Sequence, residues 1–243
     1  MKEEILARER ACFDFLNAMP KDRRYVLIGG YAVSAFEFPR LSVDLDIAIP
    51  QSELKSFEKL VKKQGFELSI EKSDIDKVYS GKFKKFVKKV ELPVSVDLLI
   101  NSVKSRQTGV SYSFDYLYEN SEVKEVTGWH PESRVRVRVV DREMLIALKI
   151  NSMRLTDKRD IIVLCYGRPD VDKIVQHLSR CPRDIIKRHV DELASLIEDP
   201  RYADSIRGVF SISEDVYKKA IKNCRMMLKE VQKKIQKSSQ DQS

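Results

Sequence analysis

Three acidic residues lie in parts of the sequence that are otherwise apolar. Asp44 and Asp46 flank one leucine in Val-Asp-Leu-Asp-Ile-Ala-Ile, and Asp97 lies in Val-Ser-Val-Asp-Leu-Leu-Ile. Side chains two residues apart in a strand point to one face, so a strand here would place the Asp44 and Asp46 carboxylates side by side. Adjacent carboxylates resist ionising together unless a cation lies near both, and a buried acid is costly unless it is paired or bound to metal. The three acids are therefore candidate ligands of a shared cation.

Two adjacent glycines precede these acids and suggest what the cation would serve. Gly29 and Gly30 follow the apolar run Tyr25–Ile28, and residues without side chains let the backbone approach a phosphate closely. A helix opening after them would add N–H groups and a partial positive charge. Carboxylate oxygens suit Mg²⁺, which commonly acts together with substrate phosphates. We therefore expect a phosphate cradle followed by metal ligands, with two Mg²⁺ ions as the cofactor and Mn²⁺ as an alternative.

Each feature also has a purely structural explanation. The glycine pair is typical of a turn between a strand and a helix. Asp44 and Asp46 could lie on the solvent face of an edge strand, although their apolar flanks argue against exposure. Asp97 could pair with a neighbouring basic residue. Taken together, the three acids favour a metal site over these alternatives.

The elements that would position these residues follow from hydrophobic periodicity and turn residues. The sequence predicts helices over 2–18, 31–38 and 53–63, and strands over 25–28, 43–49, 66–70, 93–100 and 134–139. Residues 77–90 are predicted to form an exposed strand or hairpin, and residues 101–131 to be irregular. The acids then lie on two strands of one sheet.

The pattern changes to successive helices from Asp141 onward. They are predicted at 141–154, 157–166, 170–179, 183–198 and 213–237. We expect an α/β half over residues 1–140, built as a mixed sheet flanked by helices, and an all-helical half over residues 141–243.

Charge and cysteine content limit the classes of protein. The formal net charge of +8 weakly favours anionic partners such as nucleotides or nucleic acid. The four cysteines are widely scattered, so neither a disulfide framework nor a zinc site is expected. The N-terminal residues lack the apolar stretch of a signal peptide, and no apolar run approaches the ~18 residues of a membrane span. We expect a cytoplasmic protein with reduced thiols.

Several basic clusters have both a structural and a functional interpretation. The row Arg134, Arg136 and Arg138 is typical of a solvated strand face and could also contact an RNA backbone. Lysines 82, 84, 85, 88 and 89 are interpreted as protection of an edge strand, the commoner role. Lys149 could reach solvent from a helix face, or act in a site.

The acids and glycines together resemble the signature of a known superfamily. Gly-Gly, thirteen residues, Asp-x-Asp on a strand and then a single strand Asp resemble the DNA polymerase β-type nucleotidyltransferases. Arg-Leu-Ser-Val-Asp-Leu-Asp resembles the form found in AbiEii-type nucleotidyltransferases, which are toxin components of toxin–antitoxin and phage-defence systems. That subgroup also carries a helical Lys, then an Arg, then a basic residue followed by Asp. Residues 145–160 supply these in order as Lys149, Arg154 and the pair Arg159-Asp160. The match covers roughly residues 25 to 165, while 77–90 and 101–131 match no motif.

The resemblance implies a reaction and assigns roles to residues. The reaction is transfer of a nucleoside monophosphate from an NTP to a hydroxyl, with release of pyrophosphate. Asp44 and Asp46 would bind the metals, and Asp97 would be the third ligand and the base near the attacking hydroxyl. The residues implied to line the nucleotide are Gly29, Gly30, Tyr31, Arg40, Ser42, Lys149 and Arg159.

Some of these roles have an alternative within the same resemblance. Arg40 and Ser42 would either support the metal-binding strand or contact phosphate. Lys149 and Arg159 would either approach the nucleotide or organise Asp160. Asp160 would support the metal ligands without binding the metal itself. From the residues alone, Asp157 and Asp160 are expected to stabilise the start of a helix. The helical half would complete the cleft for nucleotide and acceptor.

Partners follow only in part. The acceptor could be the 3′ end of an RNA such as a tRNA, a small molecule such as an aminoglycoside, or a protein hydroxyl. An antitoxin-like protein could bind the helical half. A non-catalytic nucleotide- or RNA-binding protein that keeps the same fold is the alternative to an enzyme.

Overall fold

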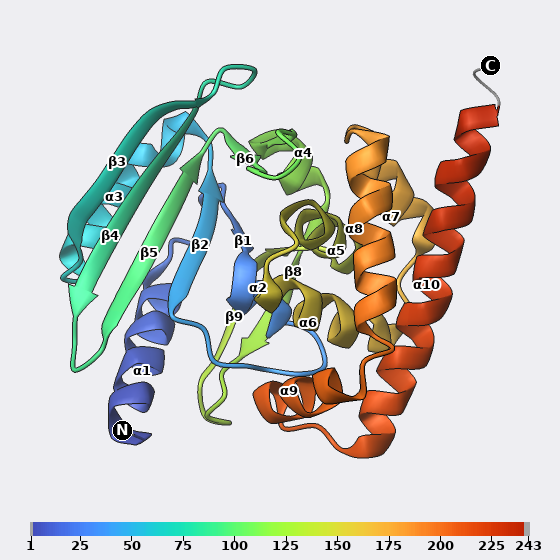
Figure 1. The fold of residues 1–243 in the computed structure, drawn as a ribbon. Coiled ribbons are helices and arrows are strands. Elements are labelled where there is room, and N and C mark those ends of the chain that lie inside the picture. The colour runs from blue at the N-terminus through green and yellow to red at the C-terminus, as the bar shows by residue number, and fades with distance from the viewer. Residues whose placement is uncertain (1, 241–243) are drawn as a thin grey trace. The chain divides into compact units, whose positions relative to one another are not determined.

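The computed structural model describes residues 2–240, and the side chains of residues 3–236. The chain divides into two compact units. The first contains the described residues up to Lys104 together with Ser111–Asp141, and the second contains Ser105–Val110 and the described residues from Arg142 onward. Figure 1 labels the elements of each unit.

A seven-stranded mixed sheet forms the framework of the first unit, in the order β3-β4-β5-β2-β1-β9-β8. β2 is parallel to β5 and β1 is parallel to β9, whereas the other neighbours are antiparallel. The strands are β1 (Val26–Ile28), β2 (Asp44–Ile49), β3 (Glu67–Asp76), β4 (Gly81–Lys89), β5 (Pro93–Ile100), β8 (Ser121–Thr127) and β9 (Arg134–Val140). The predicted fold class, a mixed sheet flanked by helices and followed by a helical half, is confirmed.

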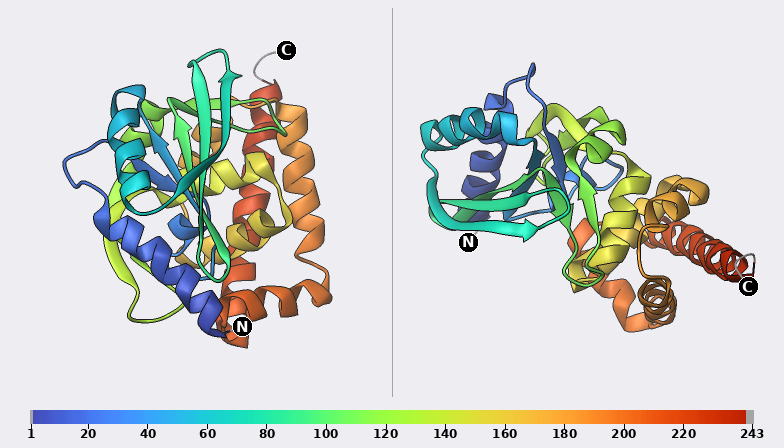
Figure 2. Two further views of the ribbon diagram at one scale, coloured as in Figure 1. Left: turned by 90° about the vertical axis from the view of Figure 1, so that its left-hand side faces the viewer. Right: turned by 90° about the horizontal axis from the view of Figure 1, so that it is seen from above.

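Helices α1 (Lys2–Ala18) and α3 (Leu54–Lys63) cover the same face of this sheet (Figure 2). Phe15 of α1 packs edge-on against Phe66, with ring centroids 5.7 Å apart, and Phe57 of α3 packs against Tyr25 at 5.9 Å. Alternate residues of β2 and β5 are fully buried, and each buried Leu or Ile contributes about 1.5–3 kcal/mol. Since a one-residue slip would turn the aspartates of these strands into the core, burial fixes the register.

Residues 101–131 are structured, so the prediction of an irregular segment is wrong. They contain a small antiparallel pair, β6 (Ser102–Lys104) and β7 (Ser111–Ser113), then α4 (Phe114–Glu119) and β8. The helix predicted over 31–38 is also shorter than expected, because α2 spans only Gly29–Val33. A short 3₁₀ turn, η1 (Gln51–Glu53), precedes α3.

The second unit is a helical bundle over the described residues. Its elements are α5 (Arg142–Ser152), α6 (Leu155–Leu164), η2 (Cys165–Gly167), α7 (Val171–Leu178), α8 (Arg183–Leu196), α9 (Pro200–Phe210) and α10 (Glu214–Gln240). The sequence prediction missed α9. α10 packs against η2 and helices α6 to α9, and its buried residues include Cys224, Leu228 and Val231. Across residues 2–240, no helix combines the length and the apolar character that crossing a bilayer requires.

Candidate active site

The register between β2 and β5 brings the three acids together on one face of the sheet. Asp46 pairs directly with Asp97, and Asp44 pairs with Ser95. Neighbouring strands lie about 4.8 Å apart and alternate residues share a face, so the three aspartates form one group of neighbours on the face opposite the buried apolar residues. Asp44 and Asp46 therefore share a face, as their spacing predicted. The Ser95 hydroxyl donates a hydrogen bond of 2.5 Å to Oδ1 of Asp44.

Asp97 is the most buried of the three acids, with a side chain only 12% exposed. Its Oδ1 atom accepts no hydrogen bond from the residues that the structure describes. Burial raises the pKa of Asp97; the Lys85 ammonium lowers it in part, and the Asp44 carboxylate raises it further. The net shift disfavours the charged form of Asp97. A metal cation beside Oδ1 would stabilise that charged form.

Lys85 lies with its ammonium beside Asp44 and Asp97, a position that its sequence context did not predict. It lies on β4 opposite Asp97, and its Nζ atom lies 3.4 Å from Oδ1 of Asp97 and 3.7 Å from Oδ1 of Asp44. The prediction that Lys85 protects an edge strand is wrong, because β3 forms the edge and β4 is an interior strand. Only the pairing of β4 with β5 could have revealed this contact.

The glycine pair packs against β2 and the loop before it. Gly29 has a φ of +71°, and a Cβ atom there would overlap Oδ2 of Asp46. A Cβ atom on Gly30 would overlap the Ser42 hydroxyl and lie 3.0 Å from Nη2 of Arg40. Both glycines are therefore needed for the close approach of these side chains. The helix that they open has five residues, which is too short for the helix N-terminal charge expected from the sequence.

Replacing Gly29 by alanine is expected to lower the free energy of unfolding by more than the cost of its backbone conformation alone. An L-residue in the left-handed region costs about 1–2 kcal/mol, and the overlap with Asp46 adds to it. Gly109→Ala is the matched control, because Gly109 has a φ of +73° and a Cβ atom there would meet no other atom within 4 Å. Urea unfolding of both variants measures the difference; equal losses would show that contact with Asp46 is unimportant.

Three further predicted residues lie around this turn: Tyr31, predicted to line the nucleotide, and Arg40 and Ser42, predicted either to support the metal-binding strand or to contact phosphate. Tyr31 is fully buried, packs edge-on against Phe13 and donates a hydrogen bond of 3.2 Å to the carbonyl of Ser42. The backbone N–H of Arg40 donates to the Ser34 hydroxyl at 3.2 Å. Tyr31 thus supports the loop that contains Ser42. The contact of all three residues with a triphosphate stays a prediction.

Lys149 lies in the second unit, in a buried ionic cluster. Its Nζ atom is 2.6 Å from Oδ2 of Asp160 and 3.3 Å from Oδ1 of Asp157, and all three side chains are at most 4% exposed. Asp157 also accepts the backbone N–H of Arg154 at 3.1 Å, at the start of α6. Burial raises the pKa of Asp157, but Lys149 and Arg154 outweigh it, and the net pKa is lowered. Asp157 therefore caps the helix, as predicted, whereas Asp160 lies beyond the first turn of α6 and pairs with Lys149 instead.

Arg159 lies beside Tyr202 in the same unit. Burial raises the pKa of Tyr202 to about 12, and Arg159 opposes this shift. The Nε atom of Arg159 is buried without a hydrogen-bond partner among the described residues. Neither Arg159 nor Lys149 is placed against a nucleotide by these contacts, and their predicted role in binding one stays a prediction.

The donor chemistry of the acid group fits a hard cation such as Mg²⁺, which prefers carboxylate oxygens. The buried Asp97 Oδ1 atom accepts no hydrogen bond from the described residues, and the ammonium of Lys85 is already shared between two of the acids. As they lie, however, no three His, Cys, Asp or Glu side chains within residues 2–240 gather closely enough to hold a metal ion. Asp46 lies against Gly29, whereas Asp44 and Asp97 lie toward Lys85.

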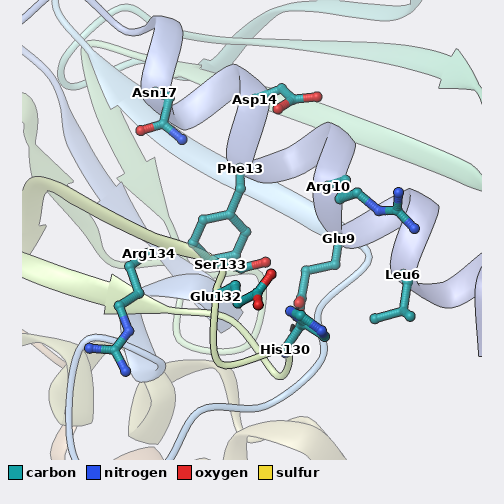
Figure 3. Close-up of a pocket in the computed structure, with 10 residues that line it drawn as sticks. All are labelled: Leu6, Glu9, Arg10, Phe13, Asp14, Asn17, His130, Glu132, Ser133 and Arg134. Carbon is teal, nitrogen blue, oxygen red and sulfur yellow. Dashed lines mark hydrogen bonds between the residues drawn. The ribbon is translucent and has the colours of Figure 1, made fainter.

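A cavity of about 390 Å³ lies elsewhere in the first unit, between α1 and the segment that leads into β9 (Figure 3). Glu9 is buried at this cavity and accepts the backbone N–H groups of Trp129 and His130 at 2.7 and 2.8 Å. The ten residues that line it include none of those predicted to bind the metal or the nucleotide. We therefore place the candidate chemistry at the acids and not at this cavity.

Comparisons with known proteins show a similarity of fold. No protein-family model matches the sequence, and a search of curated proteins found no match. Among solved structures, the chain resembles the JHP933 protein of Helicobacter pylori, with 17% identity and a TM-score of 0.51, over 98% of this chain and 96% of that one. It also resembles a structure described as a candidate nucleotidyltransferase from H. pylori, with 17% identity and a TM-score of 0.51, over 98% of each chain. The chain therefore shares its fold with these two structures.

Proposed function

We propose that this protein is a metal-dependent nucleotidyltransferase. It would transfer a nucleoside monophosphate from an NTP to a hydroxyl acceptor and release pyrophosphate. The observation that carries the proposal is the grouping of Asp44, Asp46 and Asp97 on one sheet face, with Gly29 against Asp46. The fold shared with a structure described as a candidate nucleotidyltransferase supports it.

Different residues of the first unit would have different roles in this reaction. Asp44, Asp46 and Asp97 would hold Mg²⁺, with Mn²⁺ as an alternative, and the bound metal would neutralise charge on the phosphates and on the oxygens that attack and leave. The acceptor oxygen would form a bond to the α-phosphorus as the bond to pyrophosphate breaks. The hydroxyl proton would pass to Asp97, the carboxylate that the resemblance places near the attacking hydroxyl as the base. The turn at Gly29 and Gly30 would orient the triphosphate.

The finer assignment to AbiEii-type enzymes rests on sequence. Arg40 and Ser42 precede Asp44 at the spacing of that subgroup, and in the structure they pack against Gly30. We propose an RNA 3′ end, such as that of a tRNA, as the acceptor, because the net charge of +8 favours a polyanion. An antitoxin-like protein partner belongs to the same proposal.

Incubation with each labelled NTP, Mg²⁺ and total host RNA tests the proposal. We expect pyrophosphate release and label in an RNA fraction with at least one NTP, and loss of both when EDTA removes the metal. Label on protein or on a small molecule would keep the nucleotidyltransferase and replace the acceptor. NTP binding that is indifferent to Mg²⁺, without pyrophosphate release, would favour the non-catalytic binding protein instead.

A further inference from the structure

Lys85 lies between two of the acids, at distances longer than those of a well-formed hydrogen bond. Its distances to Asp97 and Asp44, 3.4 and 3.7 Å, exceed the 2.7–3.2 Å of a well-formed N–H···O hydrogen bond. The preceding residue, Lys84, points to the other face of β4 and has shorter ion-pair distances. Its Nζ atom lies 2.7 Å from Glu58 and 2.9 Å from Glu71. The same strand thus carries one lysine fixed by its partners and one shared loosely by two carboxylates.

The position of Lys85 is the one that a metal ion would need. Asp44 and Asp97 can both reach a single cation, and Lys85 provides it. A lysine side chain is a flexible stem that carries a point charge, and that of Lys85 is 27% exposed. It can therefore leave without disturbing the backbone of β4. An entering metal ion would repel the ammonium at this range, so metal entry favours release of Lys85 from these oxygens.

We propose that Lys85 is an internal counter-ion that competes with the metal for Asp44 and Asp97. The inference rests on the proposed function, since it concerns the same carboxylates. In the metal-free protein the ammonium lies between the two acids and offsets part of their negative charge. The bare site then has a low affinity for free metal, and entry of the metal is favoured when an incoming anion such as a triphosphate receives the displaced ammonium.

Binding of Mn²⁺ in the absence of nucleotide, followed by electron paramagnetic resonance, tests this role. The substitution Lys85→Met removes the competing charge, and we expect it to tighten Mn²⁺ binding by roughly tenfold or more. Lys85→Arg keeps a cation and should stay near the wild-type affinity. A role in folding alone would not raise the affinity for a metal, so the direction of the change is diagnostic.

Lys89→Met is the matched control, because it removes one positive charge from the same face of β4. Four residues place it about 13 Å along the strand, beyond the Debye length of about 10 Å at 0.1 M salt, so its Mn²⁺ affinity should stay close to that of the wild type. Adding Asp97→Asn to Lys85→Met should abolish the gain, since the gain depends on this carboxylate.

The outcomes separate this inference from the proposed function. Equal Mn²⁺ affinity in the wild type and Lys85→Met, or weaker binding in the variant, overturns the role of Lys85 and leaves the metal site standing. A gain that survives Asp97→Asn also overturns it, because the metal would then bind elsewhere. Absence of Mn²⁺ binding in every variant overturns the counter-ion role, whereas the metal-dependent enzyme is tested separately by whether EDTA abolishes pyrophosphate release.

Discussion

The variant Asp46→Asn is expected to release pyrophosphate from NTP at least about 10²–10³-fold more slowly than the wild type. The loss of one preorganised group that stabilises transition-state charge has this size in enzymes. Asp46 is the acid that contacts Gly29 and pairs with Asp97, so it connects the glycine turn to the third carboxylate. Asparagine keeps the shape of the side chain and removes its charge, and the fold should therefore survive.

Asp22→Asn makes the same chemical change at a side chain that is 81% exposed, and it serves as the control. Initial rates of pyrophosphate release at saturating Mg²⁺ would be compared for the wild type and both variants, with urea unfolding as a check on folding. If Asp46→Asn retained activity within a few fold of Asp22→Asn, the carboxylate group would not be the active site.

The position of the acids could be predicted from sequence because it depends on a local rule. In β2 the alternation of aspartate with buried Leu45 and Ile47 determines which side chains share a face. The apolar surroundings of Asp97 likewise indicated a strand. Lys85 could not be predicted in this way, because its contact depends on which residue of β4 pairs with Asp97. Strand pairing is a long-range property that periodicity within one segment does not contain.

The errors in the fold have similar causes. Strands β6 and β7 have three residues each, too few to show a period, and α4 depends on a cap by Ser113. The helix expected over 31–38 ends at Val33, because the chain turns so that the Ser34 hydroxyl can bind the backbone of Arg40. A contact within the loop, between residues six apart in the chain, thus overrode the helical pattern next to the glycine turn.

The variant Lys149→Met is expected to lower the free energy of unfolding by about 3–5 kcal/mol. Removing one partner of a buried ion pair leaves an uncompensated charge, which has a cost of this size. Here two carboxylates, Asp157 and Asp160, would lose the ammonium that lies 3.3 and 2.6 Å away. Both are almost completely buried, so water cannot replace it.

Lys218→Met is the matched control on α10. Lys218 pairs with Glu214 through side chains that are 67% and 47% exposed, and an ion pair open to solvent contributes about 0–1 kcal/mol. Urea unfolding at neutral pH should therefore separate the two variants clearly. Equal midpoints would show that the buried cluster does not stabilise the second unit.

The pH dependence of the Lys149→Met effect gives an independent check. Burial raises the pKa of Asp157, but Lys149 and Arg154 lower it to a net value below its ordinary one. A carboxyl with a lowered pKa stabilises the fold at neutral pH and loses this contribution as the pH falls through its folded-state pKa. The gap between the wild type and Lys149→Met should therefore narrow below about pH 4.

The same measurements decide between the two roles that the sequence left open for Lys149. A structural lysine predicts a large loss of stability that acid relieves. A lysine that binds nucleotide predicts an unchanged urea midpoint with a raised KM for NTP. Because Lys149 already contacts two carboxylates at ion-pair distance, we expect the first result: its removal would damage activity through loss of the folded second unit, and not through a missing contact to the substrate.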